Sequence, residues 1–203
     1  FLSILKTNLK IKKIYLSLNE LNVNQIKKLS SIMKPSNLKS LIQNKVEAGK
    51  LILEIEIFLN NEGLLKNYIA KGDIKNLKVK TFNGLDLSKF NLSFFADRDD
   101  ILLKRISGNM NNILISQGDA KINLEKGVRL NSNFNTVINF DEFSLKRYSN
   151  VLKKYDFSKK VKSIKGNFNN IVFLNFDKTY KLKDYNYKIS GKIDESEIQL
   201  PKG

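Results

Sequence analysis

The stretch Leu51-Ile-Leu-Glu-Ile-Glu-Ile-Phe-Leu59 alternates between two sets of side chains. One set is purely aliphatic and consists of Leu51, Leu53, Ile55, Ile57 and Leu59. A period of two residues is that of a β-strand with one apolar and one wetter face. Asn60-Asn-Glu-Gly63 follows at once and supplies turn residues. The stretch therefore predicts a strand and a turn, with Glu54 and Glu56 on the solvated face and not as a catalytic pair of carboxylates.

The same period continues through the rest of residues 50–140. Alternating runs recur about every dozen residues, separated by turn sequences such as Asn83-Gly84, Asp97-Arg-Asp-Asp100 and Lys126-Gly127. Residues 141–157 predict a short helix or a connection, and residues 158–200 return to the alternating pattern. The predicted fold class is mostly β with a minor helical part, built on a long antiparallel meander.

Only residues 21–48 carry a helical period. Asn22 or Asn24 can cap a first helix that Pro35 ends, and Ser36 can cap a second helix that Gly49 ends. The apolar positions expected on these helices are Ile26, Leu29 and Met33, then Leu38, Leu41, Ile42 and Val46. The result is a short helical pair near the N-terminus, too small to form a domain of its own.

The first eighteen residues are apolar but interrupted by Lys6, Lys10, Lys12 and Lys13. They fit neither a signal sequence nor a membrane-spanning helix. An alternating run over residues 9–18 changes phase between Ile11 and Ile14, which suggests a bulge. We interpret residues 1–203 as a segment of a larger repetitive β protein, and expect any membrane anchor to lie outside it.

A weak internal repeat places a glycine inside several of the predicted strands. Ala70-Lys-Gly72-Asp-Ile74, Ile106-Ser-Gly108-Asn-Met110 and Ile164-Lys-Gly166-Asn-Phe168 share the pattern, and Ile189-Ser-Gly191 is a shorter copy. Glycine within a strand permits a bulge or a sharp bend. Either such fragments arise by chance in a β-rich chain, or the sheet is bent at intervals into a curved gutter.

The chain is strongly basic, with 36 Lys+Arg against 20 Asp+Glu and a formal net charge of +16. Lysine supplies most of the positive charge, since the only arginines are Arg98, Arg105, Arg129 and Arg147. Because bidentate recognition of phosphates and bases relies on arginine, we expect no nucleic-acid partner. A basic nucleic-acid-binding domain stays open as an alternative. A basic surface near anionic lipid head groups fits the composition better.

The residue inventory excludes many chemistries. There is no His, no Cys and no Trp, which removes disulfides, thiol nucleophiles, Ser-His-Asp triads and zinc sites built on His or Cys. Asp97, Asp99 and Asp100 lack the glycine and the distal glutamate of a calcium loop. The carboxylates near the C-terminus, from Asp194 to Glu197, are expected in solvent. The sequence predicts a non-enzymatic protein with no catalytic residue, no metal and no cofactor.

The apolar faces of the strands remain to be explained. Either the meander closes on itself as a sandwich or barrel core, or it leaves an open trough that a ligand fills. A trough of Phe, Leu and Ile side chains suits acyl chains better than a polar metabolite. The candidate lining residues are Leu51, Leu53, Ile55, Ile57, Phe90, Leu92, Phe94, Ile113, Ile115, Ile122, Leu124, Phe134 and Ile138.

The order of elements also resembles a known family. A helical pair ending Val46-Glu-Ala-Gly-Lys-Leu51 leads into a β meander that contains the glycine-bearing segments and Gln117-Gly-Asp-Ala-Lys-Ile-Asn-Leu124. Over roughly residues 19–140 this resembles the AsmA-like superfamily, particularly its YhdP branch, with TamB-like bridge-type lipid-transfer proteins as a more distant comparison.

The resemblance implies a function and a location. It implies a protein anchored in the bacterial inner membrane that extends through the periplasm as a long curved β-sheet. The hydrophobic groove of that sheet would bind phospholipid acyl chains and conduct them toward the outer membrane, together with other envelope proteins as partners. The alternative is a closed structural or adhesion module without a ligand.

Overall fold

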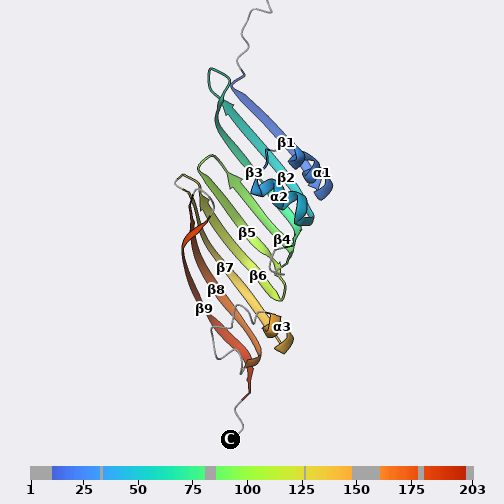
Figure 1. The fold of residues 1–203 in the computed structure, drawn as a ribbon, viewed down its shortest axis with the longest axis vertical. Helices are drawn as coiled ribbons and strands as arrows, with labels where there is room; N and C mark the ends of the chain where they lie inside the picture. Colours follow the sequence, from blue (N-terminus) through green and yellow to red (C-terminus); the bar gives the residue numbers. More distant parts are fainter. Residues whose placement is uncertain are drawn as a thin grey trace, which may run out of the picture.

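The computed structural model describes residues 11–32, 34–80, 86–125, 127–147, 161–177 and 181–199. Nine strands form one antiparallel sheet in which each strand pairs with the next one along the chain (Figure 1). The strands are β1 (Lys13–Asn22), β2 (Val46–Leu59), β3 (Leu65–Val79), β4 (Leu87–Ala96), β5 (Asp100–Met110), β6 (Ile113–Asn123), β7 (Val128–Phe140), β8 (Val161–Phe176) and β9 (Leu182–Ile198). The predicted meander is confirmed, and β1 and β9 are the two edges of an open sheet.

The described part of the chain has three helices, and all three lie between strands at the same end of the sheet. The helices α1 (Val23–Ser31) and α2 (Asn37–Asn44) connect β1 to β2, and α3 (Glu142–Arg147) follows β7. Asn22 caps α1 in a capping box with Gln25, and Ser36 caps α2, so both predicted caps are confirmed. The predicted connection at 141–157 begins with α3, and its residues from 148 on lie outside the described part of the chain.

The predicted helix ends need correction. The first helix stops at Ser31, ahead of Pro35, and α2 stops at Asn44. Val46, expected on the second helix, lies in β2 opposite Val79 because strand pairing overrides the weak helical period. Gly49 does not end a helix: it lies within β2 at φ +147, where a Cβ would meet Leu77 at 3.3 Å. Met33 and the Asn83-Gly84 turn lie outside the described residues.

The bulge predicted between Ile11 and Ile14 lies elsewhere in the structure. β1 begins at Lys13, and Ile11 precedes it. The irregular register lies further on, between Leu18 and Leu21 in the pairing with β2. Ile14 and Leu16 keep the predicted even phase, opposite Ile57 and Ile55.

The sheet has one apolar and one polar face. In an antiparallel ladder, residues that pair directly point to the same side. Register pairs such as Ile55 with Ala70, and Phe94 with Gly72, therefore belong to one side, which we call the apolar face. Pairs such as Glu54 with Lys71 belong to the other side, the polar face.

Bulges keep this division intact across strands of irregular register. Arg105 has a φ of +55, and one extra residue of β5 is taken up between the pairs Ser93–Lys104 and Asn91–Ser107. The bulge returns Ile106 to the apolar face beside Leu103. Lys89, at φ +51, marks the matching irregularity in β4. These bulges therefore keep apolar side chains on the apolar face, whereas a one-residue slip in register would turn them to the polar face.

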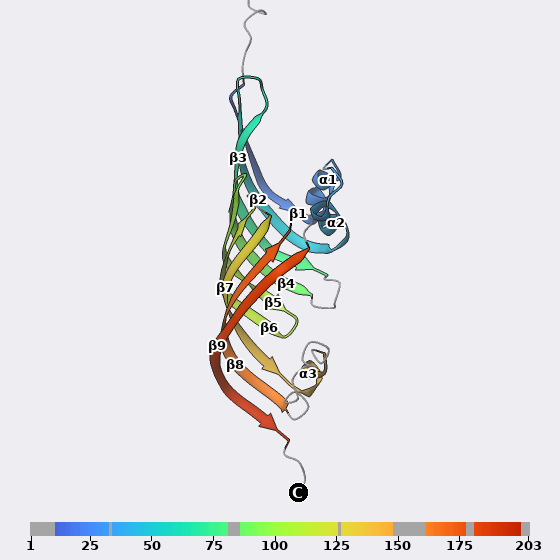
Figure 2. The same cartoon turned by 60° about the vertical axis from the view of Figure 1, so that its left-hand side comes forward.

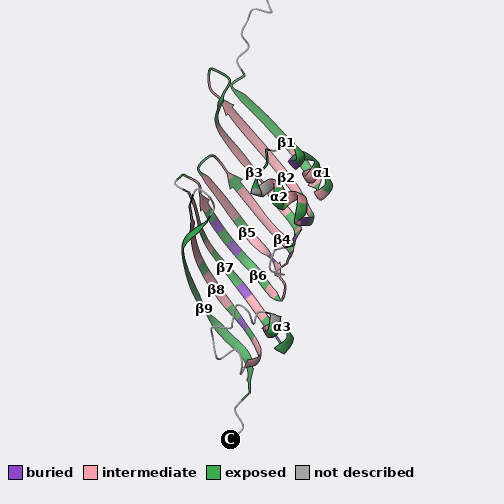
Figure 3. Ribbon diagram, viewed as in Figure 1, coloured by how far each residue is buried: buried purple, intermediate pink, exposed green. Residues whose placement is uncertain are grey.

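No second layer covers the sheet among the described residues. Among the residues that the structure describes, five apolar ones are buried, namely Val46, Val79, Ile115, Ala120 and Phe140. Taken together, β2 to β8 are mainly half-buried, and every described residue of β9 is exposed (Figure 3). Figure 2 shows β7, β8 and β9 bowed, with their hollow side facing the helices. The chain is thus a curved open sheet, and its exposed side chains must meet solvent or a ligand.

Candidate functional site

The apolar face runs without a break from β1 to β9. Leu53 pairs with Leu18 on one side and with Gly72 on the other, and the same side continues through Phe94, Leu103 and Ala120. Beyond β6 the same side continues through the register pairs of β7, β8 and β9. We call this surface the groove.

The predicted lining residues lie together on this surface. Twelve of the thirteen are in strands, and the register places all twelve on the apolar face: Leu51, Leu53, Ile55, Ile57, Phe90, Leu92, Phe94, Ile113, Ile115, Ile122, Phe134 and Ile138. Leu124 falls one residue beyond β6, where its backbone N–H donates to the Asp99 carbonyl oxygen.

Many groove residues were absent from the predicted set. β8 and β9 alone add seven large side chains that pair across the same side: Phe168, Val172, Leu174, Phe176, Tyr185, Tyr187 and Ile189. Their two-residue alternation was visible in the sequence, but the register that joins them to β7 was not. Tyr185 and Tyr187 stack with parallel rings whose centroids are 6.5 Å apart.

The glycines of the internal repeat lie on the apolar face next to phenylalanine side chains of the same sheet. A Cβ on Gly72 would lie 3.0 Å from the Phe94 ring, and one on Gly108 would lie 2.6 Å from the Phe90 ring. Gly191 stands in the same relation to Phe168. The repeat thus marks positions at which a phenylalanine ring lies where a side chain on the glycine would have to go.

The groove contains a small polar cluster whose members form hydrogen bonds with one another and with the backbone. Asn170 Nδ2 donates to Thr136 Oγ1 at 3.0 Å and to the Phe134 carbonyl oxygen at 3.2 Å. Thr136 is buried and its hydroxyl reaches the Phe168 carbonyl oxygen at 3.5 Å. Because these polar atoms have partners within the sheet, they do not require a polar ligand.

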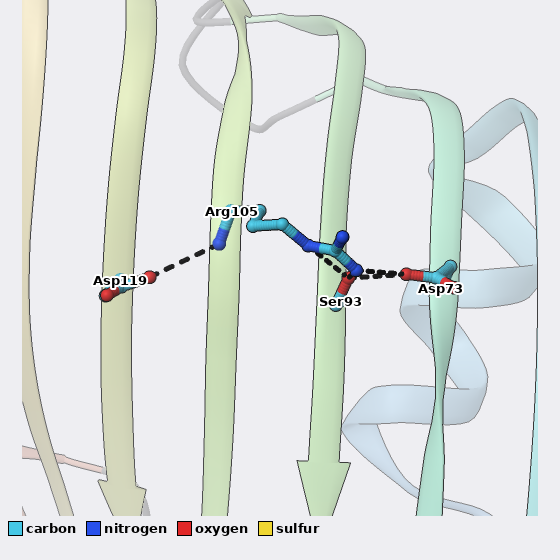
Figure 4. Close-up of polar contacts among 4 residues, drawn as sticks. All are labelled: Asp73, Ser93, Arg105 and Asp119. Atoms are coloured by element: carbon cyan, nitrogen blue, oxygen red, sulfur yellow. Dashed lines mark hydrogen bonds and ion pairs between the residues drawn. The ribbon is translucent and has the colours of Figure 1, made fainter.

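The groove lies on the hollow side of the sheet. Figure 4 views strands β3 to β6 from the polar side, and the helices lie behind them. The helices therefore occupy the apolar side, which is the hollow side in Figure 2. The burial pattern of β6 agrees, because Ile115, Gly118 and Ala120 are buried whereas the neighbouring Leu114, Ser116 and Asp119 are exposed.

The polar face is held by a ladder of charged pairs. Asp73, Ser93, Arg105 and Asp119 form a connected cluster across four strands (Figure 4). The Arg105 guanidinium reaches Asp73 Oδ1 at 3.3 Å, and its backbone N–H donates to Asp119 Oδ1 at 3.2 Å. These contacts fix the bulge at Arg105 across neighbouring strands.

Carboxylates of the polar face form ion pairs with lysine side chains. Glu54 pairs with Lys71 at 2.9 Å and Glu56 with Lys13 at 2.8 Å, which confirms their solvated position. A hydrogen bond from Lys71 holds the pKa of Glu54 below its usual range. The two glutamates thus form ion pairs with lysines on the polar face.

Other acidic groups also have structural partners. Asp97 Oδ1 accepts from the backbone N–H groups of Asp99 and Asp100, as the predicted turn requires. Across the described ranges, no cluster of acidic residues suited to a metal ion occurs. Among the described helices, none is long and apolar enough to cross a membrane.

Comparison with known proteins gives no match to a family model, to a curated protein or to a solved structure.

Proposed function

We propose that the groove binds the acyl chains of phospholipids. The observation that carries the proposal is the continuity of the apolar face across all nine strands of an open sheet. A soluble protein seldom leaves such a surface in water without a partner. The aliphatic and aromatic side chains, with Thr136 and Asn170 hydrogen-bonded to each other within the sheet, suit hydrocarbon better than a specific polar metabolite.

The dimensions of the groove suit a lipid. Eight steps between neighbouring strands, at about 4.8 Å each, give a groove roughly 40 Å long. This exceeds the ~30 Å hydrocarbon thickness of a bilayer, so an extended acyl chain can lie along it. Transport along the groove needs weak and repeated contacts, and the leucine, isoleucine and phenylalanine side chains supply them.

The resemblance to the AsmA-like superfamily adds a setting to this proposal. An open curved antiparallel sheet is the architecture that the resemblance implies. In that setting the protein is non-enzymatic, is held at the bacterial inner membrane, and conducts phospholipid through the periplasm toward the outer membrane. Lysine side chains at the rim would meet phosphate head groups while their stems cover apolar surface.

Phe94 and Phe95 provide a matched test. Phe94 lies on the apolar face opposite Gly72 and Leu103, whereas its neighbour Phe95 pairs with Lys71 and Leu102 on the polar face. A Phe94→Asp protein should lose most of the phospholipid that co-purifies with the wild type, measured by lipid mass spectrometry. The same change at Phe95 should leave the lipid in place.

Circular dichroism and thermal unfolding establish that both variants remain folded. Equal lipid content in folded Phe94→Asp and Phe95→Asp proteins would overturn the proposal. Absence of lipid from all three proteins would favour a structural module without a ligand.

A further inference from the structure

The helical pair forms a basic surface at the β1 end of the sheet. Between Glu20 and Glu47 the chain contains five lysines and no acidic residue. Lys27, Lys28 and Lys34 take part in no ion pair within the described chain. In contrast, the strand ends around β4–β5 and β6–β7 mix both charges, with Asp97, Arg98, Asp99 and Glu125.

The inner side of α1 is fixed by its contact with α2. Ser30 is buried, and its hydroxyl accepts a hydrogen bond from Gln43 Nε2 at 2.7 Å. Gln43 Nε2 also donates to the Lys27 carbonyl oxygen at 3.0 Å. At 3.6 residues per turn, this contact directs Leu29 and Ile32 to the flank and outer side of α1.

Two large apolar side chains are therefore left in solvent beside the lysines. Leu29 is 45% exposed and Ile32, at the C-cap of α1, is 84% exposed. Lys28 and Lys34 flank them in the sequence. A short helix that presents exposed aliphatic side chains among lysines, without acidic residues, has the composition of an interfacial membrane-binding helix.

We propose that the outer side of the helical pair, formed by Lys27, Lys28, Leu29, Ile32 and Lys34, docks on an anionic phospholipid bilayer. Lysines attract the negative surface and the two aliphatic side chains enter the head-group region. The uncompensated positive charge selects an anionic surface over a neutral one. This docking requires nothing of the groove. If the groove carries lipid as proposed above, docking also places its β1 end at the membrane.

Vesicle co-sedimentation tests the charge contribution. Wild-type protein should bind vesicles of phosphatidylcholine and phosphatidylglycerol, and bind vesicles of phosphatidylcholine alone much more weakly. At about fivefold per lysine near an anionic surface, Lys27→Glu/Lys28→Glu should weaken binding roughly thirtyfold or more. The matched control Lys181→Glu/Lys183→Glu makes the same charge change at the far edge of the sheet and should bind nearly as wild type.

A second pair of variants tests the apolar contribution. Leu29→Gln/Ile32→Gln should lose most vesicle binding, whereas Leu64→Gln/Leu65→Gln, at two residues that are each 61% exposed in the β2–β3 turn region, should not. Equal losses in the two lysine variants would overturn the proposal, because net charge alone would then explain binding. Binding that needs the lysines but not Leu29 and Ile32 would also overturn it, in favour of an acidic protein partner.

The groove variant separates the two proposals. Phe94→Asp should sediment with anionic vesicles as the wild type does, even when it carries no lipid. Loss of vesicle binding in this variant would contradict docking through the helical pair.

Discussion

At the scale of single residues, the groove depends on pairs of glycine and phenylalanine. Gly108 has a φ of +152, and a Cβ there would lie 2.7 Å from the Phe90 Cα. Gly63 also has a positive φ, of +80, but a Cβ there would meet nothing within 4 Å. A side chain at either glycine would be strained by the positive φ, and at Gly108 it would also meet a neighbouring strand.

Gly108→Ala is expected to destabilise the protein by about 1–3 kcal/mol more than Gly63→Ala, because only the first overpacks the sheet. Urea unfolding followed by circular dichroism measures the difference. Similar losses in the two variants would show that the Phe90 contact contributes little.

At the scale of elements, Glu47 ties the start of β2 to the end of β3. It pairs with Lys78 at 2.8 Å and with Lys80 at 2.5 Å. Hydrogen bonds from these two lysines lower the pKa of Glu47 from 4.5 to about 2. A carboxyl whose pKa is lower in the folded protein stabilises it above the unfolded pKa and loses that effect as the carboxyl becomes protonated.

The thermal midpoint of the wild type should therefore fall between pH 4.5 and about pH 2 in part through Glu47. Glu47→Gln should be less stable than the wild type at neutral pH, and the gap should close toward pH 2. Glu62→Gln, in the β2–β3 turn, serves as the control and should follow the wild type. A gap between wild type and Glu47→Gln that does not change with pH would contradict the ion pair.

The elements also show how far the sequence could be interpreted. The alternation in β2 is local, so its two faces and the positions of Glu54 and Glu56 could be predicted from the sequence. The caps at Asn22 and Ser36 are local as well. Val46 was misplaced because its partner, Val79, is distant in the sequence and overrides a helical period that only the neighbouring residues define.

The groove itself could be predicted only in part. The glycine repeat was visible, but Phe90, which lies against Gly108, belongs to the neighbouring strand, and strand register decides that pairing. The bulges at Lys89 and Arg105 each insert one extra residue, so a strict two-residue count along the sequence assigns the residues beyond them to the wrong face, and no local signal marks the bulges. The groove residues of β8 and β9 could not be assigned for the same reason, because their pairing with β7 is not evident from the sequence.

At the scale of the whole molecule, one curved sheet presents two chemically different sides. Its hollow side is mainly apolar from β1 to β9, and its other side carries the ion pairs. No second layer covers the described sheet, and under the proposed function hydrocarbon occupies the hollow side but not the other side. Successive residues of one strand point to opposite sides of the sheet, so contact with hydrocarbon is expected at every second residue.

The most direct test is photo-crosslinking in cells along β4, with a benzophenone side chain placed in turn at each residue from Phe90 to Phe95. Phospholipid adducts are predicted at Phe90, Leu92 and Phe94, and are predicted to be absent at Asn91, Ser93 and Phe95. Adducts at all six positions, or at none of them in folded protein, would contradict a lipid-filled groove.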